Sequence, residues 1–252
     1  MSIHSEIYGQ GRTLVMIHGW GMHSGVWREF AKQLSKSFQV ICIDLPGHGG
    51  SDAISPFDLE RIAVTLIQAI PAKRFSLLGW SLGGTIAIAM ADRFPERVDA
   101  LIVLAGNPQF VKSMDWLGVE EEIFDAFSVQ LQNDVQKTQL QFLALQTRHL
   151  ADGKRLFQQL KKTLLEYAPP SLEIMQAGLA ILKQSNLRQT LTNLRCPVHI
   201  IQGNKDNLIP LGNSFALQSL NPLIKLHILE DAGHVPFLSH PDQLFEIIDT
   251  VL

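Results

Sequence analysis

Ser81 lies in the segment GWSLG, residues 79–83, which has the pattern G-x-S-x-G. The apolar run at 75–80 precedes the serine and a helical pattern over 82–94 follows it, so Ser81 falls at a strand-to-helix turn. In so tight a turn, a side chain at either glycine of the segment would collide with the neighbouring strand or helix. The unpaired N–H groups and the positive dipole end at the helix N-terminus favour negative charge beside the hydroxyl. The pattern therefore predicts that Ser81 is an exposed nucleophile.

A serine nucleophile needs a base, and after a serine of this kind the partners follow along the chain as Asp or Glu and then His. Five histidines lie downstream, namely His149, His199, His227, His234 and His240. His234 stands in a glycine-bearing loop after the last apolar strand, at the sheet edge where Ser81 also emerges, and is the predicted base. The other four lie within strand patterns, among helices or before a helix-starting proline, where structural roles are expected.

The acid is expected in the loop after the preceding strand. Asp206 has this position, because it follows the apolar run at 197–203. Asp231 is the alternative, but it lies only three residues from His234 and is better suited to a turn or a helix cap. The residues thus predict a triad of Ser81, Asp206 and His234, in which His234 activates the serine and Asp206 orients the histidine.

Two backbone N–H groups are needed to bind the oxyanion that forms when an ester is attacked. One is predicted to be that of Leu82, the residue after the nucleophile. The other is predicted to be that of Trp20, in the loop HGWG at 18–21 that follows an early strand. We expect His18 to brace this loop rather than to take part in catalysis.

Short apolar runs that are rich in Val, Ile and Leu alternate with helical patterns along the chain. Strands are predicted at 13–19, 39–47, 75–80, 98–106, 197–203 and 224–230, and helices at about 24–36, 58–70, 82–94, 211–220 and 241–251. This alternation predicts an α/β fold with a mostly parallel central sheet flanked by helices. Because parallel strands end at one edge, the sheet would bring the predicted catalytic residues together.

The alternation stops between residues 108 and 192, which show helical patterns and no clear strand. We therefore predict two parts, an α/β core of residues 1–107 and 193–252 and an inserted all-helical cap of residues 108–192. Ligands of open α/β sheets bind at the carboxyl ends of the strands. A cap inserted after a strand end would form the roof of such a binding site.

The composition restricts the class of protein. The chain has 252 residues, of which 46% are hydrophobic, and a net charge of −3, which argues against binding to nucleic acid. No apolar stretch reaches 18 residues and the N-terminus shows no signal-peptide pattern, so we predict a cytoplasmic protein without a membrane segment. Cys42 and Cys196 lie in or beside strand runs and are expected to be reduced. No Cys/His cluster has the spacing of a metal site, and no cofactor is predicted.

Several of these segments together resemble the α/β-hydrolase superfamily; they are HGWG, DLPGHGGSD, GWSLGG, GNKD and AGHVPFLSHP. The finer resemblance is to the pimeloyl-[acyl-carrier protein] methyl ester esterases of biotin synthesis. The tryptophans of HGWG and GWSLGG resemble that family, as do the cap segments FLALQT at 142–147, LKKT at 160–163 and GLAILKQSNLRQTL at 178–191. The resemblance extends over essentially the whole chain. It implies the α/β-hydrolase fold with a helical cap, and a carboxylesterase that needs no cofactor.

Carried over to this sequence, the resemblance implies a triad of Ser81, Asp206 and His234. It also implies substrate contacts, which are Trp20, Ser81, Leu82, His234 and the segment Phe142, Leu143, Ala144, Leu145 and Gln146. In the family, arginines of the cap receive an acidic acyl-carrier protein. The matching positions are Lys137, Gln141, Lys154 and Gln158, so two keep a cation and two do not.

The charge pattern of the predicted cap indicates the same partner. Residues 137–162 contain six cations, Lys137, Arg148, Lys154, Arg155, Lys161 and Lys162, and the single acid Asp152. This segment therefore carries +5 and the rest of the chain −8. At about 100° per residue, the four cations from 154 onwards lie on one helix face and apolar residues on another. We predict that this basic face binds the carrier protein; a solvated helix face is the alternative.

The leading hypothesis is a monomeric serine carboxylesterase that removes the methyl group from pimeloyl-[acyl-carrier protein] methyl ester and releases methanol. A second hypothesis keeps the fold but changes the substrate to a short-chain ester, a lactone or a C–C bond. A ligand-binding receptor with a vestigial triad is the third, and the intact Ser81, Asp206 and His234 argue against it.

Overall fold

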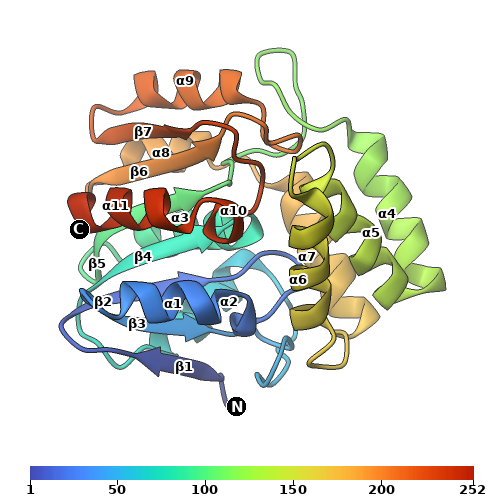
Figure 1. Cartoon of the computed structure of the whole chain (residues 1–252), viewed down its shortest axis with the longest axis horizontal. Helices are drawn as coiled ribbons and strands as arrows, with labels where there is room; N and C mark the ends of the chain where they lie inside the picture. The colour runs from blue at the N-terminus through green and yellow to red at the C-terminus, as the bar shows by residue number, and fades with distance from the viewer.

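A seven-stranded sheet forms the centre of the computed structural model, which describes residues 1–219 and 221–252 and the helical backbone of Leu220. The strands lie in the order β1-β3-β2-β4-β5-β6-β7 (Figure 1). They are β1 (Ser5–Tyr8), β2 (Arg12–Ile17), β3 (Phe38–Ile43), β4 (Phe75–Trp80), β5 (Val98–Leu104), β6 (Val198–Gly203) and β7 (Ile224–Leu229). All neighbours pair in parallel except β1 and β3. The prediction of a mostly parallel sheet is confirmed, and all six predicted strands are present.

The edge strand β1 is not among the predicted strands. Its four residues, SEIY, are too few to show an alternating or continuous apolar pattern, and most are half-buried. The strand pairs with β3 alone and runs antiparallel to it. β1 therefore depends on β3, which provides the edge of the sheet with which it pairs.

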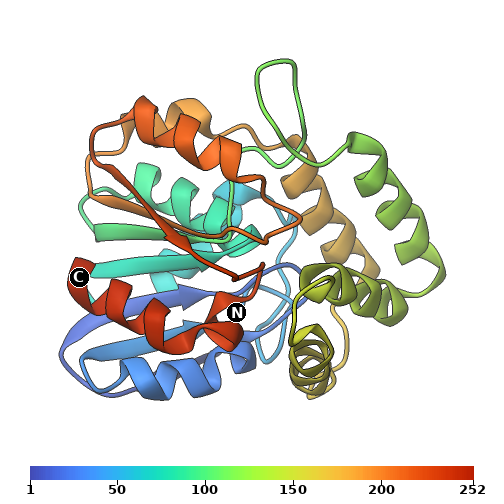
Figure 2. The ribbon, with the colours of Figure 1, turned by 45° about the horizontal axis from the view of Figure 1, so that its top comes forward.

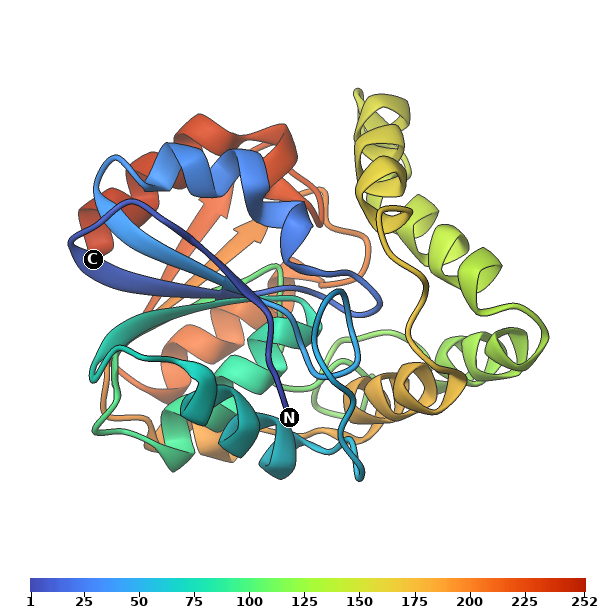
Figure 3. The same cartoon turned by 90° about the horizontal axis from the view of Figure 1, so that it is seen from below.

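Helices cover both faces of the sheet. They are α1 (Arg28–Leu34), α2 (Leu59–Ala69), α3 (Leu82–Arg93), α8 (Arg188–Asn193), α9 (Leu211–Leu220), α10 (Pro236–Ser239) and α11 (Pro241–Val251), with a 3-10 turn, η1 (Ser24–Trp27), before α1. Figure 3 shows α1 and α11 together on one face of the sheet and α2 and α3 on the other. Because both faces are covered, β2, β4 and β5 carry nearly continuous runs of buried residues.

Four further helices lie between β5 and β6 in the chain and stand at the carboxyl ends of the strands (Figures 1 and 2). They are α4 (Glu121–Asn133), α5 (Val135–Thr147), α6 (Gly153–Leu164) and α7 (Leu172–Gln184). α4 packs against α5 and α7, and α5 packs against α6. These helices therefore stand at the sheet edge where the predicted catalytic residues emerge.

The ends of the inserted segment are not part of this helical group. Residues 108–120 form a loop in which Val111 pairs with Val119, and Ser113 with Trp116, as isolated bridges. The N–H and C=O groups of this loop bond to one another, for example from the N–H of Lys112 to the carbonyl of Val119, so the segment needs no helix to pair them. At the other end, α8 packs against α3 and α9 and joins the helical layer of the core. We therefore propose that the cap consists of α4–α7, residues 121–184, instead of all of 108–192.

The described residues contain neither a disulfide nor a cluster of metal-binding side chains. Both cysteines are free; Cys42 is buried and Cys196 is half-buried. Within residues 1–219 and 221–252, no group of three or more His, Cys, Asp or Glu side chains could hold a metal ion. In the part of the chain that the structure describes, no helix is both long and apolar enough to cross a membrane.

The start of α3 lies in backbone contact with β4 and β2. A Cβ atom on Gly79 would lie 2.1 Å from the carbonyl oxygen of Gly83, and one on Gly83 would lie 2.4 Å from that of Ile17. No side chain fits at these distances, so the close approach of helix and strands requires both glycines. The expected collision of side chains at positions 79 and 83 is confirmed.

We expect Gly83→Ala to destabilise the fold by about 3 kcal/mol, or about 6–12 °C in Tm for a chain of this size, because the colliding atoms belong to backbone. Gly212→Ala in α9 is the matched control, since its Cβ would approach only the Cδ1 atom of the exposed Leu117 side chain. Thermal unfolding followed by circular dichroism measures both variants. Equal Tm values for the two would contradict the close approach of α3 to β2.

Candidate active site

Ser81 is the turn residue between β4 and α3. Its backbone has φ 56° and ψ −117°, a left-handed conformation that a residue with a side chain rarely adopts. The Ser81 N–H donates to the carbonyl of Leu104 in β5 at 3.1 Å, which ties the turn to the sheet. The side chain is 1% exposed, so the predicted exposure of Ser81 is wrong for this structure, in which the nucleophile position is buried. Its Oγ has no hydrogen-bond partner among the described residues. The hydroxyl is therefore held in a strained turn and makes no hydrogen bond that stabilises the described fold.

Asp206 and His234 are in direct contact. The Nδ1 of His234 lies 2.8 Å from the Oδ2 of Asp206, and both side chains are buried. The other carboxylate oxygen accepts the N–H groups of Leu208 and Ile209 at 2.8 and 3.1 Å. Because the carboxylate is a fixed acceptor, Nδ1 of His234 carries the proton and Nε2 presents a lone pair. That Nε2 has no partner within the described part of the chain.

The three predicted triad residues lie at the same edge of the sheet. Ser81 follows β4, Asp206 follows β6 and His234 follows β7. Trp80, the last residue of β4, donates its indole N–H to the backbone carbonyl of His234 at 2.8 Å. This bond ties the histidine loop to the strand that leads to Ser81. Trp80 is not among the predicted site residues, and its place inside the GWSLG segment is the signal that points to it.

Asp231 has the surroundings of a surface turn residue. It has φ 63°, is exposed, and pairs with Lys205 at 2.6 Å. The Lys205 ammonium lowers the pKa of the Asp231 carboxyl. The contact with His234 comes from Asp206 instead, which favours Asp206 as the acid.

The loop after β2 carries the predicted oxyanion donor Trp20. His18 in this loop is fully buried; its Nε2 accepts the N–H of Leu45 at 3.0 Å, so its Nδ1–H donates to the carbonyl of Gly19 at 2.9 Å. Burial lowers the pKa of His18 to about 3, and the ring is therefore neutral at pH 7. His18 braces the loop, as expected.

Trp20 and Leu82 present backbone N–H groups at this edge. Within the residues that the structure describes, neither N–H has a hydrogen-bond partner. Leu82 is the first residue of α3, where N–H groups have no acceptor inside the helix. Gly178 of α7 lies over both residues, since a Cβ there would be 2.9 Å from the Trp20 ring and 3.6 Å from the Leu82 side chain. The cap therefore covers the predicted oxyanion site.

An apolar pocket lies between the cap and the core. It is lined by Phe110, Val119, Ile123, Phe124, Phe127, Phe142, Leu145, Leu179, Leu182 and Leu208. Leu208 follows Asp206 by two residues, which places the pocket beside the acid loop. The volume is about 30 Å³, about the space of one water molecule. The lining suits an alkyl chain, but the cap or its side chains must move to admit one.

The segment Phe142–Gln146 on α5 supplies part of this site. Phe142 and Leu145 line the apolar pocket, and the Phe142 ring meets Trp20 edge-on at 5.0 Å between ring centroids. Gln146 is buried, and its Oε1 has no partner in the described part of the chain. Phe142 and Gln146 are four residues apart and therefore lie on the same, inward-facing side of α5.

Asn107 is a buried polar residue that the sequence pattern does not single out. It follows β5, and the strands on either side of β5 lead to Ser81 and Asp206. It is 1% exposed, and neither atom of its amide has a hydrogen-bond partner among residues 1–219 and 221–252. An unpaired buried amide costs about 1–3 kcal/mol, so such a group needs an explanation. A polar molecule bound at this edge would satisfy it.

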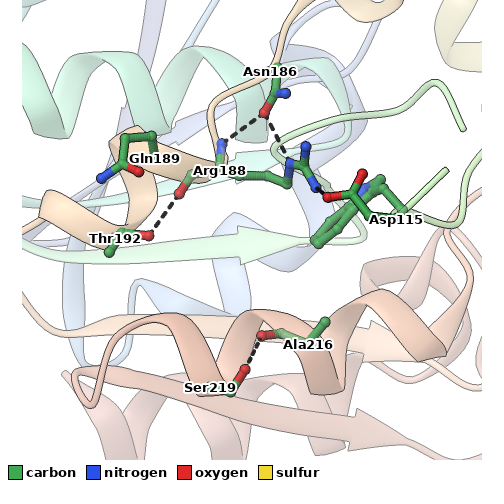
Figure 4. A pocket seen from close by; sticks show the side chains of 8 residues that line it. Asp115, Asn186, Arg188, Gln189, Thr192, Ala216 and Ser219 are labelled. Carbon is green, nitrogen blue, oxygen red and sulfur yellow. Dashed lines mark hydrogen bonds and ion pairs between the residues drawn. The ribbon is translucent and has the colours of Figure 1, made fainter. Parts of the chain in front are cut away.

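A wider cleft lies away from these residues (Figure 4). Its volume is about 430 Å³, and it is lined by Asp115, Trp116, Asn186, Arg188, Gln189, Thr192, Ala216 and Ser219. Arg188 pairs with Asp115 at 2.9 Å and lies over the Trp116 ring. Its guanidinium is therefore already engaged, and no predicted site residue lines the cleft. We assign the cleft no catalytic role.

The six cations predicted to bind a carrier lie on α5, on α6 and on the turn between them. Lys137, Arg148, Lys154, Arg155 and Lys162 are exposed, and Lys161 is half-buried. Arg155 pairs with Asp152 at 2.9 Å, whereas the other five have no ion pair among the described residues. Ala144 is also exposed, and it shares the outer face of α5 with Lys137.

The opposite side of α6 is apolar. Leu156, Leu160 and Leu164 are buried there, and Leu143 of α5 belongs to the same cluster. The apolar sector that the sequence predicts on this helix is therefore confirmed, and the exposed cations lie on the remaining surface.

Comparison with known proteins shows close relatives over the whole chain. The family described as the alpha/beta hydrolase fold matches residues 12–241. The chain is 39% identical over 251 residues to a pimeloyl-[acyl-carrier protein] methyl ester esterase from Nitrosomonas europaea, with 99% of each chain covered. It is 36% identical over 254 residues to a protein of the same name from Aeromonas salmonicida, with 98% of each covered.

A solved structure with the same fold is an esterase from Exiguobacterium antarcticum. It superposes with a TM-score of 0.88 and covers 98% of this chain and 94% of that one. Its sequence is 22% identical, so the likeness concerns the fold alone.

We expect Ser81→Ala to abolish ester hydrolysis, because the remaining groups of the triad supply no nucleophile. Loss of one triad member costs about 10⁴–10⁶ in kcat. Turnover of a p-nitrophenyl ester measures the loss, and mass spectrometry after organophosphonate treatment identifies the labelled serine in the unchanged protein. Full turnover by the variant, or a label on another serine, would contradict the assignment.

Asp206→Asn should lower kcat by about 10⁴ while the protein remains folded, because the histidine loses the carboxylate that orients it. Asp231→Asn is the matched control, since its carboxylate is exposed and pairs with Lys205. The same ester assay compares the two variants. If Asp231→Asn were the damaging change and Asp206→Asn were silent, the wrong acid would have been chosen.

Proposed function

The chain belongs to the α/β-hydrolase family and, within it, to the pimeloyl-[acyl-carrier protein] methyl ester esterases, and from this premise we propose that it hydrolyses the methyl ester of pimeloyl-[acyl-carrier protein] in biotin synthesis. The observation that carries the proposal is the contact of His234 with Asp206 at the sheet edge where Ser81 follows β4. The products are methanol and a free pimeloyl carboxylate that stays attached to the carrier.

The first half of the reaction forms an acyl-enzyme. The Oγ of Ser81 attacks the ester carbonyl, and Nε2 of His234 takes the hydroxyl proton. Asp206 keeps the imidazole in the correct tautomer and stabilises its positive charge. The backbone N–H groups of Trp20 and Leu82 hold the oxyanion, and one such donor is worth about 10²–10³ in kcat. His234 then gives the proton to the leaving methoxide, and methanol departs.

The second half releases the acid. A water molecule enters, gives its proton to Nε2 of His234 and attacks the carbonyl of the acyl-enzyme. The same two N–H groups hold the second oxyanion. When this intermediate collapses, Ser81 recovers its proton from His234 and the carboxylate leaves. These steps need a triad and two backbone donors, so the proposal includes no metal and no organic cofactor.

The acyl chain would occupy the apolar pocket under the cap. Phe142 and Leu145 line that pocket, and Leu208 joins it to the acid loop. Because the present volume is about 30 Å³, the cap must move away from the core for the chain to enter. Gln146 and Asn107, whose buried amide atoms have no partner within the described residues, are available to polar groups of the substrate.

The carrier would bind to the outer face of α5 and α6. Five of the six cations there have no ion pair among the described residues, so an acidic partner can contact them without breaking existing pairs. Ala144 lies on this face, and we propose that it contacts the carrier rather than the acyl chain. We propose that the enzyme is a monomer and acts in the cytoplasm.

The purified protein should release methanol from pimeloyl-[acyl-carrier protein] methyl ester and lower the mass of the carrier by one methylene. Mass spectrometry of the carrier measures this change, with the Ser81→Ala variant as the blank. The kcat/KM for this substrate should exceed that for free methyl pimelate and for small lactones. A higher value for the small substrates would favour a general esterase or a lactonase of the same fold.

Reversing Lys137, Lys154 and Lys162 to glutamate should raise KM for the carrier-bound ester and weaken the dependence of KM on salt, because the attraction is screened over about 10 Å at 0.1 M. Turnover of a small free ester should not change. The matched control reverses Lys36, Lys73 and Lys225, which are exposed at the amino ends of the strands and give the same change in net charge. If the two triple variants changed KM equally, the basic face would be an ordinary solvated surface and not a binding site for the carrier.

A further inference from the structure

The loop that carries the Trp20 N–H is hydrogen-bonded to three different cap helices. The amide nitrogen of Gln139 in α5 donates to the carbonyl of Gly21 at 2.7 Å. The indole N–H of Trp20 donates to the carbonyl of Met175 in α7 at 3.0 Å. On α6, the ring of His23 contacts the backbone carbonyl of Thr163.

The direction of the His23 contact follows from its other ring nitrogen. The Nδ1 of His23 accepts the N–H of Gly25 at 3.1 Å, so the proton is on Nε2. That Nε2–H then donates to the carbonyl of Thr163 at 2.7 Å. The His23 ring also lies against Tyr167, at 4.8 Å between ring centroids.

The core holds this loop at its two ends. His18 anchors the beginning through Leu45 and Gly19, and the N–H of Ser24 donates to Asp44 at 2.6 Å. Between these anchors, the hydrogen bonds to other described parts of the chain go to the cap. The middle of the loop, which includes the predicted oxyanion donor, is thus held by the cap helices.

Gln139 is placed to fix the most flexible point of the loop. Gly21 has φ 69°, a conformation that glycine adopts readily, so its own backbone does little to restrict the loop. Gln139 is 3% exposed, and a Cβ on Gly21 would lie 3.2 and 3.3 Å from two atoms of its side chain. The amide therefore holds Gly21 by both packing and a hydrogen bond, one residue from the Trp20 N–H.

We propose that Gln139 is a positioning residue for the oxyanion site and that it holds the Trp20 N–H in place through Gly21. This inference rests on the proposed function, because it assumes that the Trp20 N–H binds the oxyanion. It also joins the two parts of the molecule. Lys137 lies on the same helix as Gln139, so a carrier seated on α5 restrains the element that positions the donor.

The test compares Gln139→Met with Gln136→Met. Methionine keeps the length of the side chain and removes the donor, and Gln136 is exposed on the same helix. For a p-nitrophenyl ester, kcat of Gln139→Met should fall about tenfold with little change in KM, because a displaced Trp20 N–H binds less well to the oxyanion, which forms only when the ester is attacked. The affinity for a trifluoromethyl ketone, which forms an oxyanion on the serine, should fall by the same factor. Gln136→Met should behave as the unchanged protein.

A structural role alone would give a different result. If Gln139→Met lowered Tm but left kcat and the affinity for the ketone unchanged, the inference would be wrong. His23→Phe keeps a ring against Tyr167 and removes the bond to α6, and it should show the same loss in kcat and ketone affinity. It remains informative if Gln139→Met fails to fold. The unchanged protein's own turnover of the carrier-bound ester tests the proposed function separately, and absence of all ester turnover would overturn both.

Discussion

The close approach of α3 to the centre of the sheet is the constraint on which the rest of the site depends. Gly79 and Gly83 allow backbone to meet backbone there, and the chain can reverse direction only if Ser81 adopts a left-handed conformation. The strain in this turn is held by the sheet, since the Ser81 N–H bonds to β5. The serine is fixed at the end of a central strand, and the loops after β2, β6 and β7 lie at the same edge of the sheet.

Buried polar groups at this edge fall into two kinds. Asp44 and His18 are fully hydrogen-bonded and hold loops in place. By contrast, the Oγ of Ser81, the Nε2 of His234 and the amide of Asn107 have no partner among the described residues. Each unpaired buried group reduces stability by about 1–3 kcal/mol, so a fold selected for stability alone would not place three such groups at one sheet edge. In the proposed function, a substrate bound at this edge completes their hydrogen bonding.

The cap has two different surfaces. Its inner surface is apolar and reaches the oxyanion loop, the acid loop and the pocket. Its outer surface carries the cations of α5 and α6. The turn between these helices also touches the loops after β6 and β7, because Asn207 donates to the carbonyl of Arg148 at 3.2 Å and Gly233 lies against Leu150. A partner bound outside can therefore influence the geometry inside through a few contacts.

The sequence by itself determined six of the seven strands and the strand-to-helix turn at Ser81, because apolar runs, helical periods and the glycines around Ser81 are local patterns. It also placed Asp206 and His234 in loops at the same sheet edge and favoured Asp206 over Asp231, but the contact of Asp206 with His234 at 2.8 Å is visible only in the structure. β1 was not predicted because a strand of four residues is too short to show an apolar pattern. Tertiary packing alone decided which face of α5 turns inward and which group Gln139 binds. The amide of Gln139 bonds to Gly21 across 118 residues, and the sequence around either residue does not indicate such a contact, because local patterns carry no information about distant partners.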